Sequence, residues 1–267
     1  MHNWIPPHRF FPYLTWEKIS TMPNKNHVVI IQPIGAIEQH GPHLPLIVDS
    51  AIATAVTGQA LAQLPPEIPA YSLPPLYYGK SNEHINFPGT ITLSANTLTN
   101  ILLEVGESIY RAGFRKLVFV NGHGGQPQIL EIVARDLHAK YSDFCLFPLF
   151  VWRVPHIADQ LLTEREYQQG IHAGDAETSL MLSLLPEQVD MTKAVCTYPP
   201  DCPQSLLSME GDLPFAWLTN ELSETGVLGD ATVATKDKGD RLLASLVASW
   251  VEVFIQVHQF QPPHPTV

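Results

Sequence analysis

The sequence predicts an α/β fold in which a mostly parallel β-sheet carries helices on both faces. Three observations predict it: apolar, β-branched runs of strand length, helical segments between them, and no linker long or polar enough to divide the chain. Strands joined by helical crossovers run parallel, and a parallel sheet is normally covered on both faces. At 267 residues the chain is near the upper size for one hydrophobic core, so we expect a single domain over residues 1–267.

The first half of the chain predicts two strands and two helices. No charged residue interrupts the run HVVIIQPIG at 27–35, which reads as a buried strand. A loop rich in Gly and Pro follows, and Asp49 or Ser50 is expected to cap a helix over 51–64. After a second irregular stretch we expect a short strand at 91–93. A helix then runs from its cap at Ser94 to about Tyr110.

The second half continues the alternation of strand and helix. KLVFVN at 116–121 is a strand, and 127–140 has apolar residues at helical spacing. The apolar run at 143–152 is the next strand. Further helices are expected over 175–185 and about 236–257, with a Pro-rich, Cys-bearing stretch between them near 198–203.

The composition narrows the classes of function. Charged residues make up 15% of the chain against about 25% in an average soluble domain, which indicates surface buried between subunits. The net charge of -11 without a Lys/Arg run argues against a nucleic-acid partner. No apolar run approaches the roughly 18 residues of a membrane span, and the first residues lack the regions of a signal peptide. We therefore expect no membrane partner and a cytoplasmic location.

The three cysteines indicate neither a disulfide framework nor a thiolate zinc site. Cys145, Cys196 and Cys202 are an odd number and show no CxxC spacing. They are interpreted as incidental.

Histidine and carboxylate side chains gather in three predicted loops that follow strands, where a sheet of this type binds its ligand. The residues are Glu38, His40, His43 and Asp49 in the first loop, His123 within NGHGG in the second, and His172, Asp175 and Glu177 in the third. Imidazole and carboxylate without cysteine form the ligand set expected for Zn, Mn or Fe, and a carboxylate such as Asp49 can bridge two ions. Two such ions would activate a shared water for hydrolysis.

Each of these residues also has a structural interpretation, because a single loop His or Glu is more often a surface residue or a cap. Joint placement favours a site: Glu38 and His40 point to the same side if the segment is extended. For His43 and Asp175 we favour the structural role, and Glu177 could be a first-turn acid stabilised by a helix dipole. The glycines of NGHGG are expected to let a substrate approach closely.

Five ordered motifs resemble those of the creatininase (creatinine amidohydrolase) family and span most of the chain. They are PIGAIEQHGPHLPLIVD (33–49), GKSNEHINFPGTITL (79–93), NGHGG (121–125), HAGDAETSLML (172–182) and GVLGDATVATKDKGDRLL (226–243). The resemblance implies a creatininase-like three-layer sandwich and metal-dependent hydrolysis of a C–N amide bond. It also implies a homo-oligomer, commonly a hexamer.

The resemblance also implies roles for individual residues. By position, Glu38, His40, Asp49 and His123 match the family's metal ligands, with Asp49 as the bridging carboxylate of two divalent ions per subunit (Zn, Mn or Fe). His172 matches the histidine that shuttles a proton. Glu177 matches an acid at the metal and substrate pocket, and is assigned both as a ligand and as a catalytic residue.

Two positions depart from creatininase itself. Gly125 stands where creatininase has a metal-binding Glu, so either Glu177 replaces that ligand or the second ion binds weakly. Gln168 stands where creatininase has a pocket Trp, although Trp152 matches its other pocket Trp. These departures count against creatinine as the substrate. NGHGG followed by Gln126 is closer to the broader subgroup that includes a deformylase acting on a formamidopyrimidine ribonucleotide.

The sequence therefore predicts a metal-dependent amidohydrolase that cleaves a cyclic amide or formamide of a small molecule, with metal-activated water and His172 delivering a proton. One alternative is a formamidopyrimidine-ribonucleotide deformylase-like hydrolase, for which Lys80, Arg153 and Arg165 are candidate phosphate ligands. The other is a catalytically silent metal-binding scaffold, which the presence of His172 disfavours.

Overall fold

The computed structural model describes residues 4–199 and 206–262. Cys202 and most of the predicted irregular stretch at 198–203 lie outside these residues. Cys145 and Cys196 are free thiols.

The main sheet has four parallel strands in the order β2, β1, β3, β4. Their bounds are β1 (Val29–Ile34), β2 (Ala70–Ser72), β3 (Lys116–Asn121) and β4 (Cys145–Phe150). In the register, Ile34 lies beside Asn121 and Asn121 beside Phe150, so the carboxyl ends of β1, β3 and β4 lie level. The prediction of a parallel sheet is confirmed.

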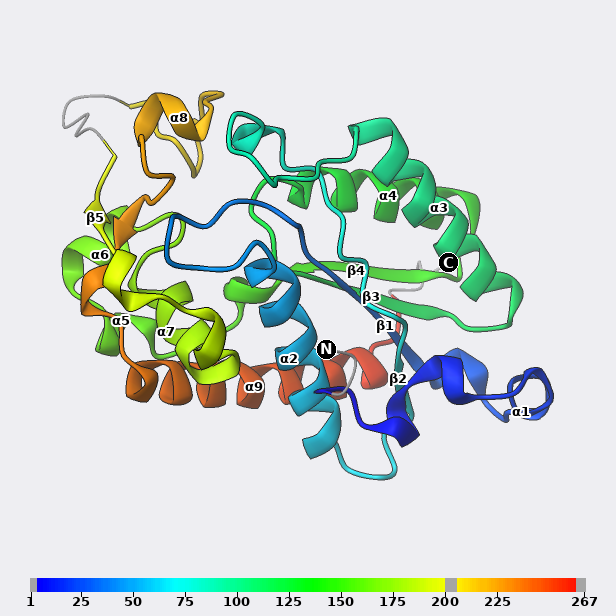
Figure 1. Cartoon of the computed structure of the whole chain (residues 1–267). Coiled ribbons are helices and arrows are strands. Elements are labelled where there is room, and N and C mark those ends of the chain that lie inside the picture. Colours follow the sequence, from blue (N-terminus) through cyan, green and yellow to red (C-terminus); the bar gives the residue numbers. More distant parts are fainter. Residues whose placement is uncertain (1–3, 200–205, 263–267) are drawn as a thin grey trace.

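Helices cover both faces of the sheet (Figure 1). They are α2 (Val48–Gln63), α7 (Asp175–Leu184) and α9 (Lys236–Gln259) on one face, and α3 (Ala95–Arg111) and α4 (Pro127–Lys140) on the other. Successive side chains of a strand point to opposite faces. Accordingly, Val29 and Ile31 are buried in the core on the α2 side, and Ile30 is buried in the core on the α3 side.

Helix α9 is long and apolar enough to cross a membrane, by length and mean hydropathy alone. Its buried residues include Leu242, Leu246, Trp250 and Phe254, which recur every four residues and so form one stripe. This stripe belongs to the hydrophobic core that α9 shares with α2 and α7. The burial of this stripe is what the core helix of a globular domain requires.

The remaining elements are short. They are the helices α1 (Trp16–Thr21), α5 (Ala158–Leu161), α6 (Glu164–Gln169) and α8 (Thr219–Leu222), the 3-10 turn η5 (Asn82–His84), and an antiparallel pair of β5 (Cys196–Thr197) and β6 (Gly229–Asp230). Six further 3-10 turns described in the structure are η2 (Pro7–Arg9), η3 (Phe11–Tyr13), η4 (Lys25–His27), η6 (Val151–Arg153), η7 (Pro186–Gln188) and η8 (Met191–Lys193), and η9 (Ala231–Val233) precedes α9.

Two local predictions were wrong. The segment 91–93 is not a strand: Ile91 makes one isolated antiparallel bridge to Ile37, and the edge strand β2 lies earlier. Neither Asp49 nor Ser50 caps α2, because the helix already begins at Val48. The Ser50 hydroxyl instead donates to the carbonyl oxygens of Ala36 and Tyr77.

Two glycines let the first turn of α2 lie directly against the ends of β1 and β3. A Cβ at Gly35 would overlap the backbone of Ser50, and a Cβ at Gly122 would overlap the carbonyl oxygen of Asp49. Any larger residue at either position would push the helix away from the sheet. This close approach is what places Asp49 at the carboxyl edge of the sheet.

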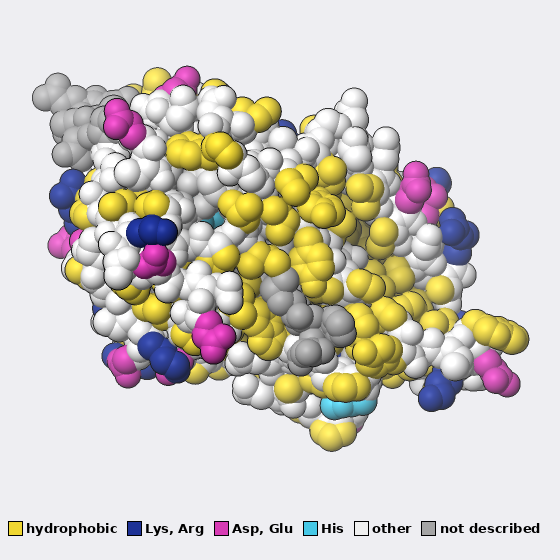
Figure 2. All heavy atoms as spheres, viewed as in Figure 1, with side chains coloured by type: hydrophobic (Ala, Val, Ile, Leu, Met, Phe, Trp, Pro, Cys, Tyr) yellow, Lys and Arg dark blue, Asp and Glu magenta, His cyan; other side chains and the backbone are white. Residues whose placement is uncertain are grey.

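Much of one face is apolar. Figure 2 shows hydrophobic side chains gathered across the middle of the face seen in Figure 1, while charged side chains lie mostly toward its margins. Large hydrophobic residues with at least a third of their surface exposed include Trp16, Leu46, Tyr78, Ile85 and Ile91.

Candidate metal centre

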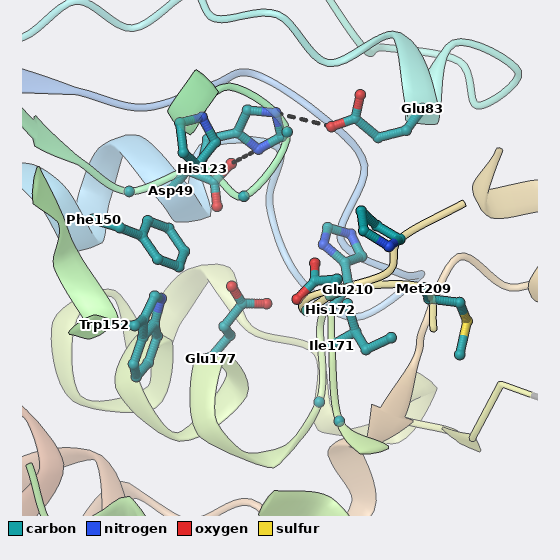
Figure 3. Close-up of a pocket in the computed structure, with 18 of the residues that line it drawn as sticks. Asp49, Glu83, His123, Phe150, Trp152, Ile171, His172, Glu177, Met209 and Glu210 are labelled. Atoms are coloured by element: carbon teal, nitrogen blue, oxygen red, sulfur yellow. Dashed lines mark ion pairs between the residues drawn. The ribbon is translucent and has the colours of Figure 1, made fainter. Parts of the chain in front are cut away.

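The candidate site lies at the carboxyl edge of the sheet, where β1 and β3 are neighbours and the strand order changes direction. Doubly wound sheets bind ligands at this switch point. A cavity of about 870 Å³ opens here (Figure 3). Its walls include Glu38, Asp49, Glu83, His84, His123, Phe150, Trp152, His172, Glu177, Met209, Glu210 and Trp217.

The two carboxylate oxygens of Asp49 face two different imidazoles. Oδ1 lies 3.3 Å from Nε2 of His40, and Oδ2 lies 3.2 Å from Nδ1 of His123. Glu38 Oε2 is also 3.2 Å from His123 Nδ1, and Glu177 Oε2 is 3.9 Å from His40 Nε2. We call Glu38, Asp49 and His123 the first donor set, and His40, Asp49 and Glu177 the second donor set. Asp49 belongs to both.

Compact groups of donor atoms recur across the site. Three groups, in each of which the donor atoms lie within 4.8 Å of one another, are His40, Asp49 and Glu177; Glu38, Glu83 and His123; and Glu38, His40 and His172.

Backbone carbonyls orient the two imidazoles. Nδ1 of His40 lies 3.2 Å from the carbonyl oxygen of Glu38, and Nε2 of His123 lies 2.9 Å from the carbonyl oxygen of Lys80. Because a carbonyl only accepts, each of these nitrogens carries the proton of the neutral ring. When the ring is neutral, its other nitrogen, which faces the carboxylates, has a lone pair available for a cation.

Three buried polar atoms of the site lack a hydrogen-bond partner within the part of the chain that the structure describes. They are Glu38 Oε2, His40 Nε2 and Asp49 Oδ2. Buried polar atoms nearly always have a hydrogen-bond partner. Here each of three side chains of a kind that binds metal ions has one buried atom without such a partner among the described residues, and all three lie in the same site. Oxygen and imidazole donors arranged in this way fit a divalent cation.

The protonation of the site reflects burial opposed by close opposite charges. Burial lowers the pKa of His40, but the carboxylates of Asp49, Glu177 and Glu38 outweigh it and raise this pKa to about 9. Burial raises the pKa of Glu177 to about 7, which the charge of His40 only partly offsets. Burial also acts to raise the pKa of Glu38, but His123 and His84 hold it well below its ordinary value.

His172 lies between two other imidazoles. Its ring centroid is 4.2 Å from that of His40 and 4.3 Å from that of His84. Burial, together with the neighbouring imidazoles, holds the pKa of His172 well below its ordinary value. Its Nε2 lies 2.8 Å from the carbonyl oxygen of Gln39, so the neutral ring keeps the lone pair on Nδ1, 3.9 Å from Glu38 Oε1.

The comparison with known proteins decides the family, because the creatininase model, described as creatinine amidohydrolase, matches residues 12–254. The chain belongs to the creatininase family. The mycofactocin precursor peptide peptidase of Mycolicibacterium smegmatis is 34% identical, over 88% of this chain and 86% of that protein. The creatinine amidohydrolase of Pseudomonas putida is 30% identical, over 88% of this chain and 91% of that protein.

Solved creatininase structures share the fold. A manganese form is 29% identical with a TM-score of 0.76 over 96% of this chain and 99% of that one. A Zn–Zn form of a mutant creatininase is also 29% identical, with a TM-score of 0.74 over 95% and 98%. Like its relatives, this creatininase-family protein is a hydrolase acting on C–N bonds.

All six residues to which the sequence assigned a ligand or catalytic role lie in this one site of the creatininase-family chain. They are Glu38, His40, Asp49, His123, His172 and Glu177. The other two residues, His43 and Asp175, to which the sequence gave a structural role, have partners outside the two donor sets. His43 Nε2 lies at hydrogen-bonding distance, 2.8 Å, from the Thr178 hydroxyl oxygen, and Asp175 binds the side chains of Ser179 and Lys238.

The structure corrects the interpretation of Gly125. A Cβ at this position would overlap Oε1 of Glu83 and crowd Nε2 of His123. The space beside Gly125 is therefore filled by the protein's own carboxylate rather than left for a substrate. Glu177, which the sequence offered as the replacement ligand, lies in the second donor set, 3.9 Å from Nε2 of His40.

Sequence reasoning missed the roles of Glu83 and His84, although both lie in the quoted motif at 79–93. An acid next to a histidine in a Gly- and Pro-rich segment was the signal that could have found them. Of the three phosphate candidates, Lys80 and Arg153 line the cavity, whereas Arg165 stacks over the ring of Tyr198.

In this chain, the two positions that match pocket tryptophans of creatininase have different surroundings. Trp152 lines the cavity beside Phe150 (Figure 3). Gln168, at the other position, donates its side-chain amide to Glu164 on the exposed side of α6.

Proposed function

We propose that this protein is a metal-dependent amidohydrolase whose two donor sets hold two divalent ions, Zn, Mn or Fe, with Asp49 shared between them. The observation that carries the proposal is the single buried carboxylate whose two oxygens face two differently placed imidazoles. Divalent ions held by these residues would supply the polarisation of an amide carbonyl and the activation of a water molecule. The manganese and Zn–Zn forms of related creatininases support this choice of ions.

The protein's own residues supply the proton transfer. His172 is neutral, and its Nδ1 faces Glu38 beside the donor sets. This nitrogen takes up the proton released when water attacks the carbonyl carbon, and delivers it to the departing nitrogen of the amide. Glu177 is held in place by the backbone N–H of Ala173, which donates to Oε2 at 2.6 Å.

The shape of the cavity favours an extended amide such as a peptide. A volume of about 870 Å³ is near the upper end for small-molecule sites, far larger than a single small ring needs. Phe150 and Trp152 form one wall and Met209 and Glu210 lie across from them (Figure 3). The similarity to a peptide peptidase supports this substrate class.

A cyclic amide is the second candidate, supported by the similarity to creatinine amidohydrolase. A ribonucleotide fits less well, because the carboxylates of Glu83 and Glu210 lie in the same cavity as Lys80 and Arg153 and would repel a phosphate.

The proposal is tested with the wild type, Asp49→Asn and, as control, Glu104→Gln on the exposed side of α3. Metal content is measured by elemental analysis, and hydrolysis is measured on creatinine, N-formyl compounds and short peptides. We expect about two ions per chain in the wild type and the control, and loss of both ions and of hydrolysis in Asp49→Asn. Full activity in chelated, metal-free protein would refute the proposal. Bound metal with no hydrolysis of any amide would favour the scaffold instead.

A further inference from the structure

We infer that Glu83 and His84 together form a clamp that orients the first donor set, Glu83 through His123 and His84 through Glu38. The inference rests on the proposed two-ion site. The two residues are consecutive in the short turn η5, yet each reaches a different ligand. We call them the η5 clamp and regard both as positioning residues.

His84 fixes one oxygen of Glu38. The side-chain amide of Gln39 is oriented by its own partners, since Oε1 accepts from the N–H of Gly41 and Nε2 donates to the carbonyl of Gly226. Its Nε2 lies 2.8 Å from Nδ1 of His84, which therefore accepts. The proton of the neutral His84 ring is then on Nε2, 3.3 Å from Glu38 Oε1. With Oε1 held, Oε2 is left facing His123.

Glu83 acts on the far edge of the His123 ring. Its Oε1 lies 3.0 Å from Nε2, the nitrogen that carries the proton, whereas Nδ1 faces Glu38 and Asp49 (Figure 3). The Lys80 carbonyl also accepts this N–H, but it is neutral. A carboxylate placed here adds negative charge, which makes Nδ1 a stronger donor to a cation.

The space around Gly125 shows that the carboxylate is built into the site. The oxygen of Glu83 lies where any side chain at position 125 would have to begin. Glu83 is also largely buried, with 15% of its side chain exposed, so it is not a freely moving surface acid.

The second donor set is held by other parts of the chain. The Glu38 carbonyl orients His40, and the N–H of Ala173 orients Glu177. The η5 clamp therefore distinguishes the two positions: disturbing it should weaken one ion and spare the other.

The test measures binding of Zn²⁺ to metal-free, full-length protein by titration calorimetry, with thermal melting of the metal-free protein beside it. In Glu83→Ala and His84→Gln we expect the affinity for one of the two equivalents to fall by about 10- to 100-fold. The other equivalent stays within about twofold, and the metal-free melting temperature is unchanged. Glu83→Gln falls between wild type and Glu83→Ala, because its amide oxygen still accepts the N–H without the charge.

Two controls frame the result. Glu104→Gln should leave both equivalents unchanged, and Glu177→Gln should weaken the equivalent that Glu83→Ala spares. The double variant Glu83→Ala with Glu177→Gln should then weaken both.

Three outcomes would overturn the clamp. The first is unchanged Zn²⁺ binding in Glu83→Ala. The second is equal weakening of both equivalents together with a lower metal-free melting temperature. The third is a Zn²⁺ affinity of Glu83→Gln as low as that of Glu83→Ala, which would make Glu83 itself a ligand. Uptake of a single ion by the wild type would refute the two-ion proposal instead. The clamp would then be judged on that one ion.

Discussion

The imidazole of His172 packs against that of His40 in a tilted arrangement, with ring centroids 4.2 Å apart and 37° between the planes. Because His40 carries a positive charge in the absence of a cation, a second charge on His172 is strongly disfavoured. The pair thus consists of one ring directed at Asp49 and one neutral ring beside it.

This arrangement predicts that His172→Asn lowers kcat by about 10²- to 10⁴-fold, the usual loss when a general acid–base group is removed. The two ions should remain bound, since His172 is in neither donor set. Steady-state kinetics and elemental analysis on the same preparation check both parts. If the variant lost one ion along with activity, His172 would be a ligand and not a proton shuttle.

Metal binding should strengthen as the pH rises. At pH 7 the metal-free His40 is protonated, because its pKa is raised to about 9, so an ion entering the second donor set must displace this proton. One released proton corresponds to about a tenfold gain in apparent affinity per pH unit between pH 7 and 8.5. Below pH 7 the slope should steepen, because Glu177, with a pKa of about 7, must also lose a proton.

Calorimetry in buffers of different ionisation enthalpy counts these protons. His40→Gln should release about one proton fewer than the wild type on binding its remaining ion. An affinity that stays constant from pH 6 to 8.5 would show that the metal-free His40 is already neutral.

Glu166 should be a major contributor to the stability of the region around the site. Its buried carboxylate accepts the backbone N–H of Asp175 at 2.7 Å, the N–H of Asp230 at 2.8 Å and the hydroxyl of Tyr198 at 2.9 Å. Hydrogen bonds to a charged group are worth about 1.5–3 kcal/mol each, and removing the acceptor leaves buried donors unpaired. We therefore expect Glu166→Ala to lower the free energy of unfolding by about 3 kcal/mol or more in urea denaturation.

The matched control is Glu164→Ala, two residues earlier in the same helix and exposed. Its effect should stay within about 0.5 kcal/mol. Equal unfolding midpoints for the two variants would mean that the Glu166 network adds nothing to folding.

The apolar face in Figure 2 predicts that the protein is a homo-oligomer. Contiguous apolar surface of this kind is normally covered by a partner, and in a homo-oligomer the partner is an identical subunit. Sedimentation velocity at micromolar concentration should give a species several times the 29.7 kDa of one chain. A single 29.7 kDa species throughout the concentration range would contradict this.

The long elements could be predicted because their patterns are local. The strand at 116–121 and the helix at 127–140 have the predicted bounds, since their apolar spacing and flanking residues decide them. The grouping of the site residues also followed from sequence, because loops after parallel strands meet at one edge.

What the sequence missed depends on contacts between distant segments. Strand β2 has only three residues and is determined by its pairing with β1. A pairing between distant segments leaves no periodic pattern in the sequence. Ser50 has the residue type of a cap, but its hydroxyl is drawn to Ala36 by the close packing of α2. The contact between Glu83 and His123 joins residues forty positions apart, so neither neighbourhood reveals it.

The contact of α2 with Gly35 and Gly122 has a consequence for how such enzymes diversify. The spacing of the candidate ligands depends on direct contact between main-chain atoms, and a single methyl group at either glycine would disturb it. Residues such as Trp152 and Met209 shape the opening above and take no part in that contact. Residues of the cavity wall can therefore change between related proteins, and substrate preference with them, while the positions of the donor residues stay the same.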